Sequence, residues 1–196
     1  MGHTGNTDIV KELLNYGAKV NVQTLDRRTA LHFATWRGNT DIVQQLVSHG
    51  ANVNLQDEDL WAPLYWAAKL NYIQIARILV ENGANLNCVN AGVFQCMIDN
   101  KDIKTEDRIS LCDIFIDAGY PIHSNSSLPQ ILSRKPNMDQ NFVKHVQTRQ
   151  LDVLTLKSMC RICVRHELIQ KTNGCSIRGK LSQLPLPKLL QNYIIL

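Results

Sequence analysis

Three side chains near residue 160 have the types and spacing that could bind a metal ion. Cys160 and Cys163 are three residues apart and His166 follows, so on a helix the two thiols would share one face. Cys175 is a possible fourth ligand, but the second closely spaced pair typical of a structural zinc site is missing. The pattern therefore favours packed thiols over zinc ligands, and we expect neither a metal nor a cofactor.

The cysteines could also act as nucleophiles if a histidine lay beside one of them. Five histidines are candidates for that role: His32, His49, His123, His145 and His166. None is accompanied by a glycine loop that could form an oxyanion hole, or by a local signature of a thiol enzyme. We therefore expect a protein that is not an enzyme, although an enzyme with a reactive, low-pKa thiol stays a rival hypothesis.

The net charge of +4 is unevenly distributed along the 196 residues. Residues 1–150 hold 14 Lys and Arg against 15 Asp and Glu, a net charge of −1, whereas residues 151–196 hold 7 against 2, a net charge of +5. The basic residues of the second part are scattered and are not interleaved with aromatic residues. We therefore expect a solvated helix face or an acidic protein partner there, and no nucleic acid.

Cysteine spacing and hydropathy limit where the protein can work. The six cysteines lack the spacing of a disulfide framework, and no run of about 18 apolar residues could cross a membrane. Asp8, Lys11 and Glu12 interrupt any apolar run near the start, so we expect no signal peptide. These features predict a cytoplasmic protein, with the nucleus as a second location, and no membrane partner.

The elements that position these residues follow an internal repeat of 33 residues. Four kinds of residue recur at that interval: Ile9, Ile42 and Ile75; Gly17, Gly50 and Gly83; Ala18, Ala51 and Ala84; and Asn21, Asn54 and Asn87. Each unit ends in a helix, and its glycine supplies the left-handed residue that caps the C-terminus of that helix. An earlier helix is predicted from the segments Thr29–Ala34 and Ala62–Ala68.

A period of 33 with two short helices in each unit and a G-A-x-V-N-like ending resembles the ankyrin repeat, over residues 1 to about 123. The resemblance implies an all-α solenoid of helix–turn–helix units with short β-turn fingers. Small alanines would let the antiparallel helices approach closely, and leucines and isoleucines would be buried against the next unit. His32 takes the histidine position of the T-P-L-H motif, where its ring would hydrogen-bond the neighbouring backbone.

Several positions depart from the ankyrin pattern. The first unit has lost its first helix, so we expect the chain to be an N-terminal truncation of a longer array. Arg27 replaces the glycine of the turn, and Asn71 replaces the glycine between the helices of the third unit. The fourth unit is degenerate, and its glycine, Gly119, comes 36 residues after Gly83, which indicates three inserted residues within the range 99–108.

Two further motifs follow one another within residues 155–196. A predicted helix carries an apolar stripe made of Leu154, Leu156, Met159, Cys160 and Val164. Later, residues 184–187 read L-P-L-P, a rigid extended piece because each proline fixes its own φ and restricts the residue before it. A helix this apolar with little chain after it needs a partner surface.

In this order the two motifs resemble the SOCS box, which implies two binding surfaces. The first half matches the pattern [STP]-L-x-x-x-C-x-x-x-[VIL], so the resemblance implies that the apolar stripe binds elongin C, together with elongin B. The second half matches the cullin-5-binding class, which implies that Leu184, Pro185, Leu186 and Pro187 face cullin-5 and its RING protein. The alternative that part of this strip folds back on the box stays open. Cys160 then takes a position that suits a small buried apolar group better than a zinc ligand.

The ankyrin resemblance also implies a concave groove for a protein substrate. Its candidate residues are aromatic or basic: Arg28, Phe33, Trp36, Arg37, Trp61, Trp66 and Lys69. Tryptophan and arginine on one face are typical of binding hot spots. We expect Trp61, which follows three acidic residues in a finger, to be exposed. Two alternatives stay open for Trp66, which would either face the groove or pack between repeats.

Together the two resemblances predict three parts. Residues 1–123 would be ankyrin repeats, residues 124–150 a connector with short helices, and residues 151–196 a small three-helix SOCS box. Apolar residues from Phe142 to Leu154 would pack the connector onto the SOCS box.

Ankyrin repeat and SOCS box proteins are adaptors, so the family implies a function without catalysis. The SOCS box would recruit the elongins and the cullin-5–RING scaffold, while the groove would hold a protein substrate for ubiquitination. The sequence does not identify that substrate. The rival hypothesis is an ankyrin interaction module that does not recruit a ligase and whose last segment only caps the stack.

Overall fold

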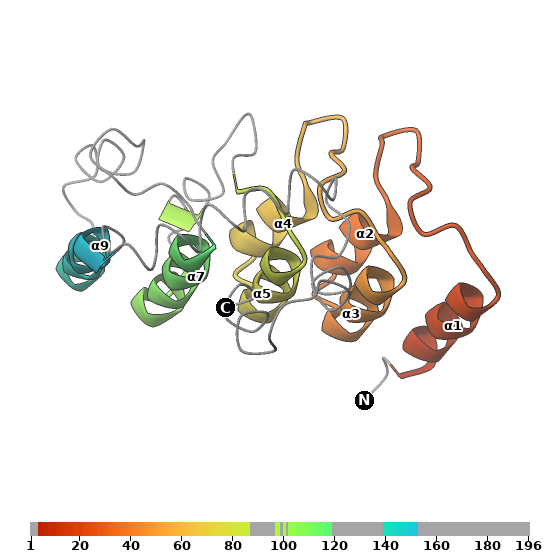
Figure 1. Ribbon diagram of the computed structural model, residues 1–196, viewed down its shortest axis with the longest axis horizontal. Coiled ribbons are helices and arrows are strands. Elements are labelled where there is room, and N and C mark those ends of the chain that lie inside the picture. Colours follow the sequence, from red (N-terminus) through yellow and green to blue (C-terminus); the bar gives the residue numbers. More distant parts are fainter. Residues whose placement is uncertain (1–3, 87–96, 99, 101, 119–138, 153–196) are drawn as a thin grey trace, which may run out of the picture.

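The computed structural model describes residues 4–86, 97–98, 100, 102–118 and 139–152, and within these residues it contains seven helices and no strands (Figure 1). The helices are α1 (Thr4–Asn15), α2 (Ala30–Trp36), α3 (Thr40–Ser48), α4 (Pro63–Lys69), α5 (Ile73–Glu81), α7 (Thr105–Asp117) and α9 (Gln140–Asp152). The all-α fold and the repeated helix pairs confirm the predicted ankyrin solenoid.

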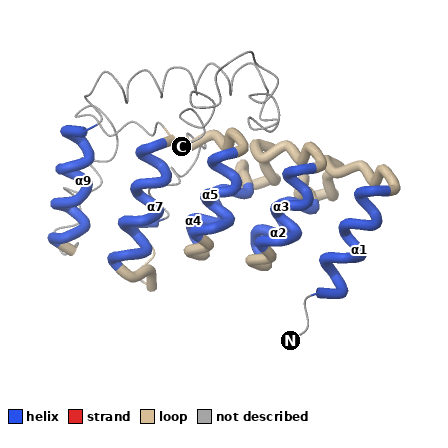
Figure 2. The backbone as a smooth tube through the Cα atoms, turned by 60° about the horizontal axis from the view of Figure 1, so that its bottom comes forward, coloured by secondary structure: helices blue, strands red, loops and turns tan. Residues whose placement is uncertain are grey.

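The helices are arranged in two layers. Helices α1, α3, α5, α7 and α9 form one row in which each helix packs on the next, and α2 and α4 lie behind that row (Figure 2). Within a repeat, α2 packs on α3 and α4 packs on α5, while α2 and α4 also contact each other. The loops before α2 and α4 project from one side of the stack as the two fingers of the second and third repeats (Figure 1).

The inner helices α2 and α4 are short. Each has seven residues, about two turns, and most of its side chains are buried. Pro63 occupies the first turn of α4, where the missing N–H costs no hydrogen bond. Leu31 and Leu64, one repeat apart, are fully buried, and the small residues Ala67 and Ala68 let α4 approach its neighbours closely. The aromatic residues Phe33 and Trp36 of α2 and the basic residue Lys69 of α4 stay exposed.

Left-handed residues set the turns of the stack. Gly17, Gly50 and Gly83 have φ of 82°, 85° and 91°, which confirms the predicted C-caps. Arg27 and Asn71, which replace family glycines, also adopt positive φ, at 58° and 59°. The equivalent of Arg27 one repeat later is Leu60, and its φ is 64°. That leucine is a left-handed residue that the sequence did not predict, and it stores strain in the third finger.

Asparagines at the 33-residue interval join each repeat to the next one. The Nδ2 atom of Asn21 donates to the carbonyl of Gly50 at 3.1 Å, and its Oδ1 accepts from the backbone N–H of Asn52 at 2.7 Å. Asn54 makes the same pair of bonds to Gly83 at 2.9 Å and to Asn85 at 2.7 Å. The recurring asparagine therefore bridges loops of consecutive repeats.

The fourth repeat is lengthened within its outer helix. Helix α7 has 13 residues, whereas α3 and α5 have 9 each. The extra residues therefore add about one turn to α7, and this agrees with an insertion near its start. Met97 and Ile98, where the family motif has degenerated, are still buried in the core.

Helix α9 packs on the repeat stack, a contact that the sequence did not predict. Phe142 and Val146 are buried against α7. Asp113 of α7 accepts from Nε of Arg149 at 3.0 Å and lies 2.8 Å from Nε2 of His145; Arg149 also pairs with Asp117. We expected the apolar residues from Phe142 onward to pack on the SOCS box, but Phe142 and Val146 pack on the ankyrin stack.

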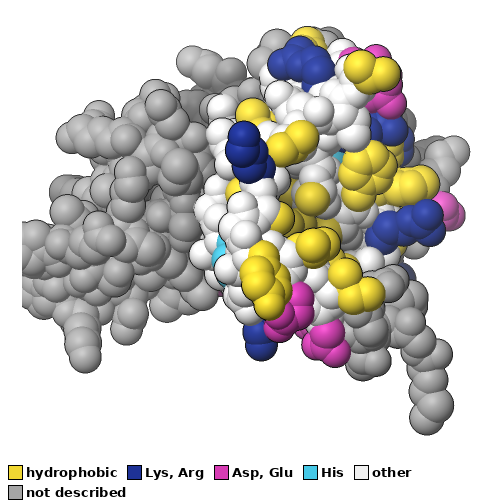
Figure 3. All heavy atoms as spheres, turned by 90° about the vertical axis from the view of Figure 1, so that its right-hand side faces the viewer, with side chains coloured by type: hydrophobic (Ala, Val, Ile, Leu, Met, Phe, Trp, Pro, Cys, Tyr) yellow, Lys and Arg dark blue, Asp and Glu magenta, His cyan; other side chains and the backbone are white. Residues whose placement is uncertain are grey.

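The α1 end of the stack has an apolar surface. Residues 4–29 contain one helix, as expected for a first unit without its first helix. Ile9, Leu13 and Tyr16 are 59%, 56% and 88% exposed, and Figure 3, which views this end, shows hydrophobic side chains spread among charged ones. Helix α1 thus contributes Leu14 to the core and packs on α3, while much of its other apolar surface stays exposed.

Candidate binding surface

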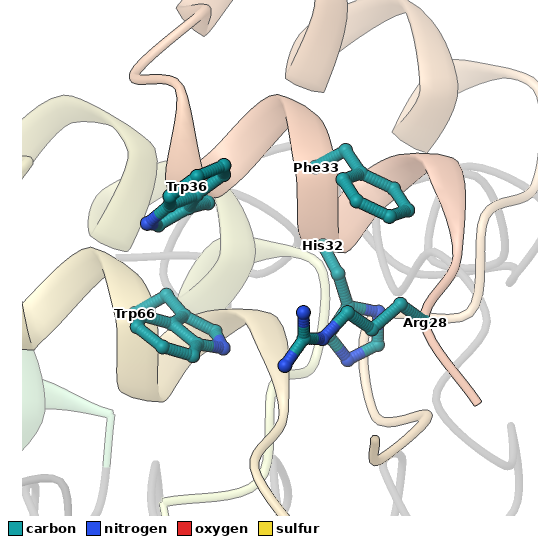
Figure 4. A pocket seen from close by; sticks show the side chains of 5 residues that line it. All are labelled: Arg28, His32, Phe33, Trp36 and Trp66. Carbon is teal, nitrogen blue, oxygen red and sulfur yellow. The ribbon is translucent and has the colours of Figure 1, made fainter. Parts of the chain in front are cut away.

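The predicted groove residues gather on α2, on α4 and at the bases of the two fingers. A pocket of about 130 Å³ is lined by Arg28, His32, Phe33, Trp36 and Trp66. In Figure 4, Trp36 and Trp66 face each other from neighbouring helices, while Arg28 reaches in from the finger below them. The structure therefore brings side chains from two repeats together around one space.

The aromatic walls of this pocket are accessible. Phe33 is 44% exposed and Trp36 is 48% exposed, although Leu31 and Ala34 of the same helix are buried. Trp66 is half-buried on the other side of the pocket, so it both faces the pocket and contacts its own repeat. Exposed aromatic rings on a rigid helix are the kind of anchors that binding interfaces use.

His32 forms the floor of the pocket and joins the two repeats. Its Nδ1 accepts a hydrogen bond from the backbone N–H of Thr29 at 3.1 Å, so Nε2 carries the hydrogen and donates to the carbonyl of Trp61 at 3.2 Å. Burial lowers the pKa of His32 below its usual 6.5, because the charged imidazolium is poorly solvated there. The floor is therefore a neutral ring, and its predicted hydrogen bond to the backbone is confirmed.

Arg28 is oriented by a buried carboxylate of the next finger. Oδ2 of Asp57 lies 3.6 Å from Nε of Arg28, and this ion pair is longer than a hydrogen bond. Oδ1 of Asp57 accepts from the backbone N–H groups of Asp59 at 3.1 Å and Trp61 at 2.9 Å. Asp57 thus closes its own finger while it attracts the guanidinium of Arg28, a third of whose side chain stays exposed.

A second aromatic cluster lies on the third repeat. The rings of Trp61 and Tyr65 stack at 4.6 Å with an interplanar angle of 15°, and Trp66 meets both edge-on at 5.2 and 5.8 Å. Nζ of Lys69 lies over all three rings, at 5.1 to 5.6 Å from their centroids. Trp61 is half-buried by this stacking, so the expectation that it would be exposed was wrong.

Besides His32, two buried residues that contact the binding surface were not among the predicted groove residues, although the repeat period could have found them. Tyr65 lies one period after His32. At this position the second repeat has a histidine that hydrogen-bonds the backbone of Trp61, and the third repeat has a tyrosine whose ring stacks on that of Trp61. Asp57 lies one period after Thr24, whose Oγ1 accepts from the N–H of Arg28 just as Asp57 accepts from that of Trp61. Aligning the two repeats position by position reveals both.

Cys112 is the one cysteine whose surroundings the structure describes. Its thiol is buried, and this burial, reinforced by the neighbouring carboxylate of Asp113, raises its pKa well above the usual range. A thiol of this kind is neither nucleophilic nor accessible at neutral pH. Cys160, Cys163, Cys175 and His166, the alternative metal ligands, lie outside the described residues.

The residues predicted to bind the ligase also lie outside the described residues. These are Leu154, Leu156, Met159, Cys160 and Val164 for elongin C, and Leu184, Pro185, Leu186 and Pro187 for the cullin. Their assignment stays a prediction, whereas the seven groove candidates can all be placed on the fingers, on α2 and α4, or directly after α2. No helix that the structure describes is long and apolar enough to cross a membrane.

Comparison with known families agrees with both halves of this organisation. The family model for ankyrin repeats, with three copies, matches residues 2–90, and the family model for the SOCS box matches residues 152–195. No curated protein matches the chain. Both modules are non-catalytic, and in combination they make a substrate-recognition adaptor for elongin–cullin ubiquitin ligases. The chain belongs to the ankyrin repeat and SOCS box protein family.

Proposed function

We propose that this chain is the substrate-recognition adaptor of a ubiquitin ligase built on elongin B, elongin C, cullin-5 and a RING protein. The observation that carries the proposal is the order of the two modules: repeats with an aromatic, basic surface, and then a SOCS box match that contains L-P-L-P at residues 184–187. The adaptor does no chemistry itself. It raises the effective concentration of substrate lysines near the ubiquitin-charged enzyme.

Within this proposal the chain has three parts with separate tasks. Residues 1–123 hold the substrate, residues 124–150 connect, and residues 151–196 recruit the ligase in the cytoplasm. The docking of α9 on α7 supports a rigid connection, because Phe142, Val146 and the Asp113–Arg149 ion pair fix α9 to the stack immediately before the matched SOCS box. A fixed spacing between substrate and ligase is what transfer to a particular lysine needs.

Co-expression with elongin B and elongin C tests the recruiting half of the proposal. The wild-type chain should be purified by affinity and size exclusion as a stable complex with both elongins. The double variant Leu156→Pro, Cys160→Phe should lose the elongins, because it breaks the proposed helix and overfills its stripe. Lys157→Ala, which alters the same segment outside the motif, should retain them.

The outcome also separates the rival hypothesis. An adaptor loses its elongins in the double variant while the thermal unfolding of the repeat stack is unchanged. A wild-type chain that is purified as a monomer and binds neither elongin would instead support an ankyrin interaction module that recruits no ligase. A double variant that retains both elongins would contradict the proposed roles of Leu156 and Cys160.

A further inference from the structure

The pocket between α2 and α4 has the size and the walls of a receptor for one aromatic side chain. Its volume of about 130 Å³ is close to that of a dry protein cavity of about 150 Å³ that accepts benzene. Phe33, Trp36 and Trp66 form its walls, and the neutral ring of His32 forms its floor. An apolar ring entering this space would stack or meet these rings edge-on, in the arrangements that aromatic side chains favour.

Besides Arg28, two basic residues lie beside the aromatic walls of this pocket. Arg37 lies directly after α2, with its guanidinium carbon 5.1 Å from the ring centre of Trp36, and Lys69 ends α4 over the rings of the third repeat. Within the described residues neither cation forms an ion pair, and both are exposed. A cation that rests on an aromatic face keeps its charge available for an incoming anion.

Acidic residues are absent from the two helices that bear the pocket. The sequences of α2 and α4, ALHFATW and PLYWAAK, contain no Asp or Glu. Among the described residues, acidic side chains lie at two places near these helices. In the finger turns Asp57 is buried and Asp26, Glu58 and Asp59 are exposed, and beyond the end of α4 Asp107 accepts a hydrogen bond from Asn71 at 2.9 Å. The surface over the helices is therefore aromatic and positively charged, while the finger turns are mixed in charge.

This charge arrangement distinguishes between two ligands that aromatic pockets can take. A cationic side chain would fit a cage of rings, but here it would meet Arg28, Arg37 and Lys69 and find no carboxylate in the pocket. An aromatic side chain flanked by carboxylates satisfies both features, because the ring fills the pocket and the carboxylates neutralise the cations. Charge complementarity of this kind sets both partner choice and association rate.

We propose that the substrate is recognised through an acidic segment that carries an aromatic side chain, with the ring between Trp36 and Trp66 and the flanking carboxylates on Arg37 and Lys69. This inference rests on the proposed function, in which the same surface holds the substrate, and it specifies the chemical class of that substrate. Arg28, already drawn toward Asp57, contributes its charge at the finger side of the pocket.

Three fluorescein-labelled peptides test the proposal by fluorescence anisotropy with the full chain in complex with elongin B and elongin C. The first has the sequence Gly-Glu-Glu-Phe-Glu-Glu-Gly, the second replaces Phe by Ala, and the third replaces every Glu by Lys. The elongins alone serve as the blank. We expect the first peptide to bind at least tenfold more tightly than either of the others, and to weaken as salt is added.

Two sets of variants locate the binding. Arg37→Glu with Lys69→Glu should reverse the preference toward the lysine peptide, and Phe33→Ser should weaken the first peptide about tenfold without unfolding the stack, because Phe33 is exposed. The matched control is Arg77→Glu on α5, an exposed charge reversal in the other helix layer, which should change nothing.

The possible failures are distinguishable. Equal binding of the acidic and basic peptides, or binding that survives the double charge reversal, would overturn the proposed substrate class. So would a first peptide that does not bind in the millimolar range to a chain that retains both elongins. A wild-type chain that does not bind the elongins would instead contradict the adaptor function. The peptide affinities of that chain alone would then still test the proposed substrate class.

Discussion

The second and third repeats share one backbone but carry different chemistry. Their finger turns have the same hydrogen bonds: the backbone N–H of Thr24 donates to Arg28, as that of Asp57 does to Trp61, and a side chain in each turn accepts in return. Their caps, asparagine bridges and buried leucines also coincide. The backbone therefore depends on the residues that recur every 33 positions.

The exposed and buried side chains around the binding surface differ between the two repeats at three aligned positions. Arg28 corresponds to Trp61, His32 to Tyr65, and Phe33 to Trp66. One repeat consequently presents a cation and a hydrogen-bonded imidazole, while the next presents three contacting rings under Lys69. The recurring residues therefore specify the scaffold, and the residues outside the repeat pattern specify what the scaffold binds.

The largest effect should come from positions that the two repeats share. Leu31→Ala and Leu64→Ala each empty a fully buried site, and we expect each to lower the free energy of unfolding by about 2–5 kcal/mol. Because the sites are equivalent, the two losses should agree to within about 1 kcal/mol. Urea unfolding measures both, and a much smaller loss at one position would show that the repeats do not contribute equally to one core.

The finger carboxylate should distinguish the repeats. Asp57→Ala removes a buried acceptor of two backbone N–H bonds, and we expect a loss of about 2–3 kcal/mol; Thr24→Ala, the equivalent change in the more exposed finger, should cost about 1 kcal/mol. Urea unfolding of both variants provides the measurement. Equal losses would contradict the larger stabilising contribution that we assign to the buried carboxylate of Asp57.

Acid should destabilise the second repeat through His32. The folded pKa of His32 lies below the unfolded value of 6.5, so below pH 6.5 the unfolded chain binds more protons, and stability falls as the pH is lowered. His32→Tyr, which copies the third repeat, should remove part of this slope. Unfolding free energies between pH 8 and pH 5 provide the test, and an identical slope in both proteins would exclude a contribution from His32.

The smallest effect concerns the left-handed residues of the fingers. Leu60→Gly and Arg27→Gly relieve positive φ at equivalent positions, and we expect each to stabilise the chain by about 0.5–1 kcal/mol, because part of the relieved strain is offset by the greater entropy of unfolded glycine. Thermal unfolding can resolve this gain. Destabilisation by Leu60→Gly would mean that the contacts of the leucine side chain stabilise the fold by more than its positive φ destabilises it.

Much of the scaffold could be predicted from the sequence, because its determinants are local and periodic. The glycine caps, the degenerate fourth repeat and the hydrogen bonding of His32 follow from residues at fixed intervals. The exposure of Trp61 was predicted wrongly because its burial depends on a stacking partner, Tyr65, on the next helix. Side-chain packing across elements is what a repeat pattern leaves undetermined.

The docking of α9 was missed for a related reason. It depends on contacts between residues 32 to 36 positions apart, such as Arg149 with Asp113, and no local motif marks them. The pocket was predicted in part. Its aromatic and basic residues were predicted, but the sequence did not show that His32 forms its floor, because this depends on the three-dimensional arrangement of the fingers. The ligase-binding residues rest on motif resemblance and stay predictions.

The central claim, that one chain joins a substrate surface to a cullin-5 ligase, is tested most directly by assembly. Purified chain–elongin B–elongin C complex should be mixed with cullin-5 and its RING protein and passed over size exclusion, beside a variant with alanine at Leu184, Pro185, Leu186 and Pro187. We expect one larger species for the wild type, and a variant that keeps the elongins but loses the cullin. A wild-type complex that elutes apart from cullin-5 would contradict it.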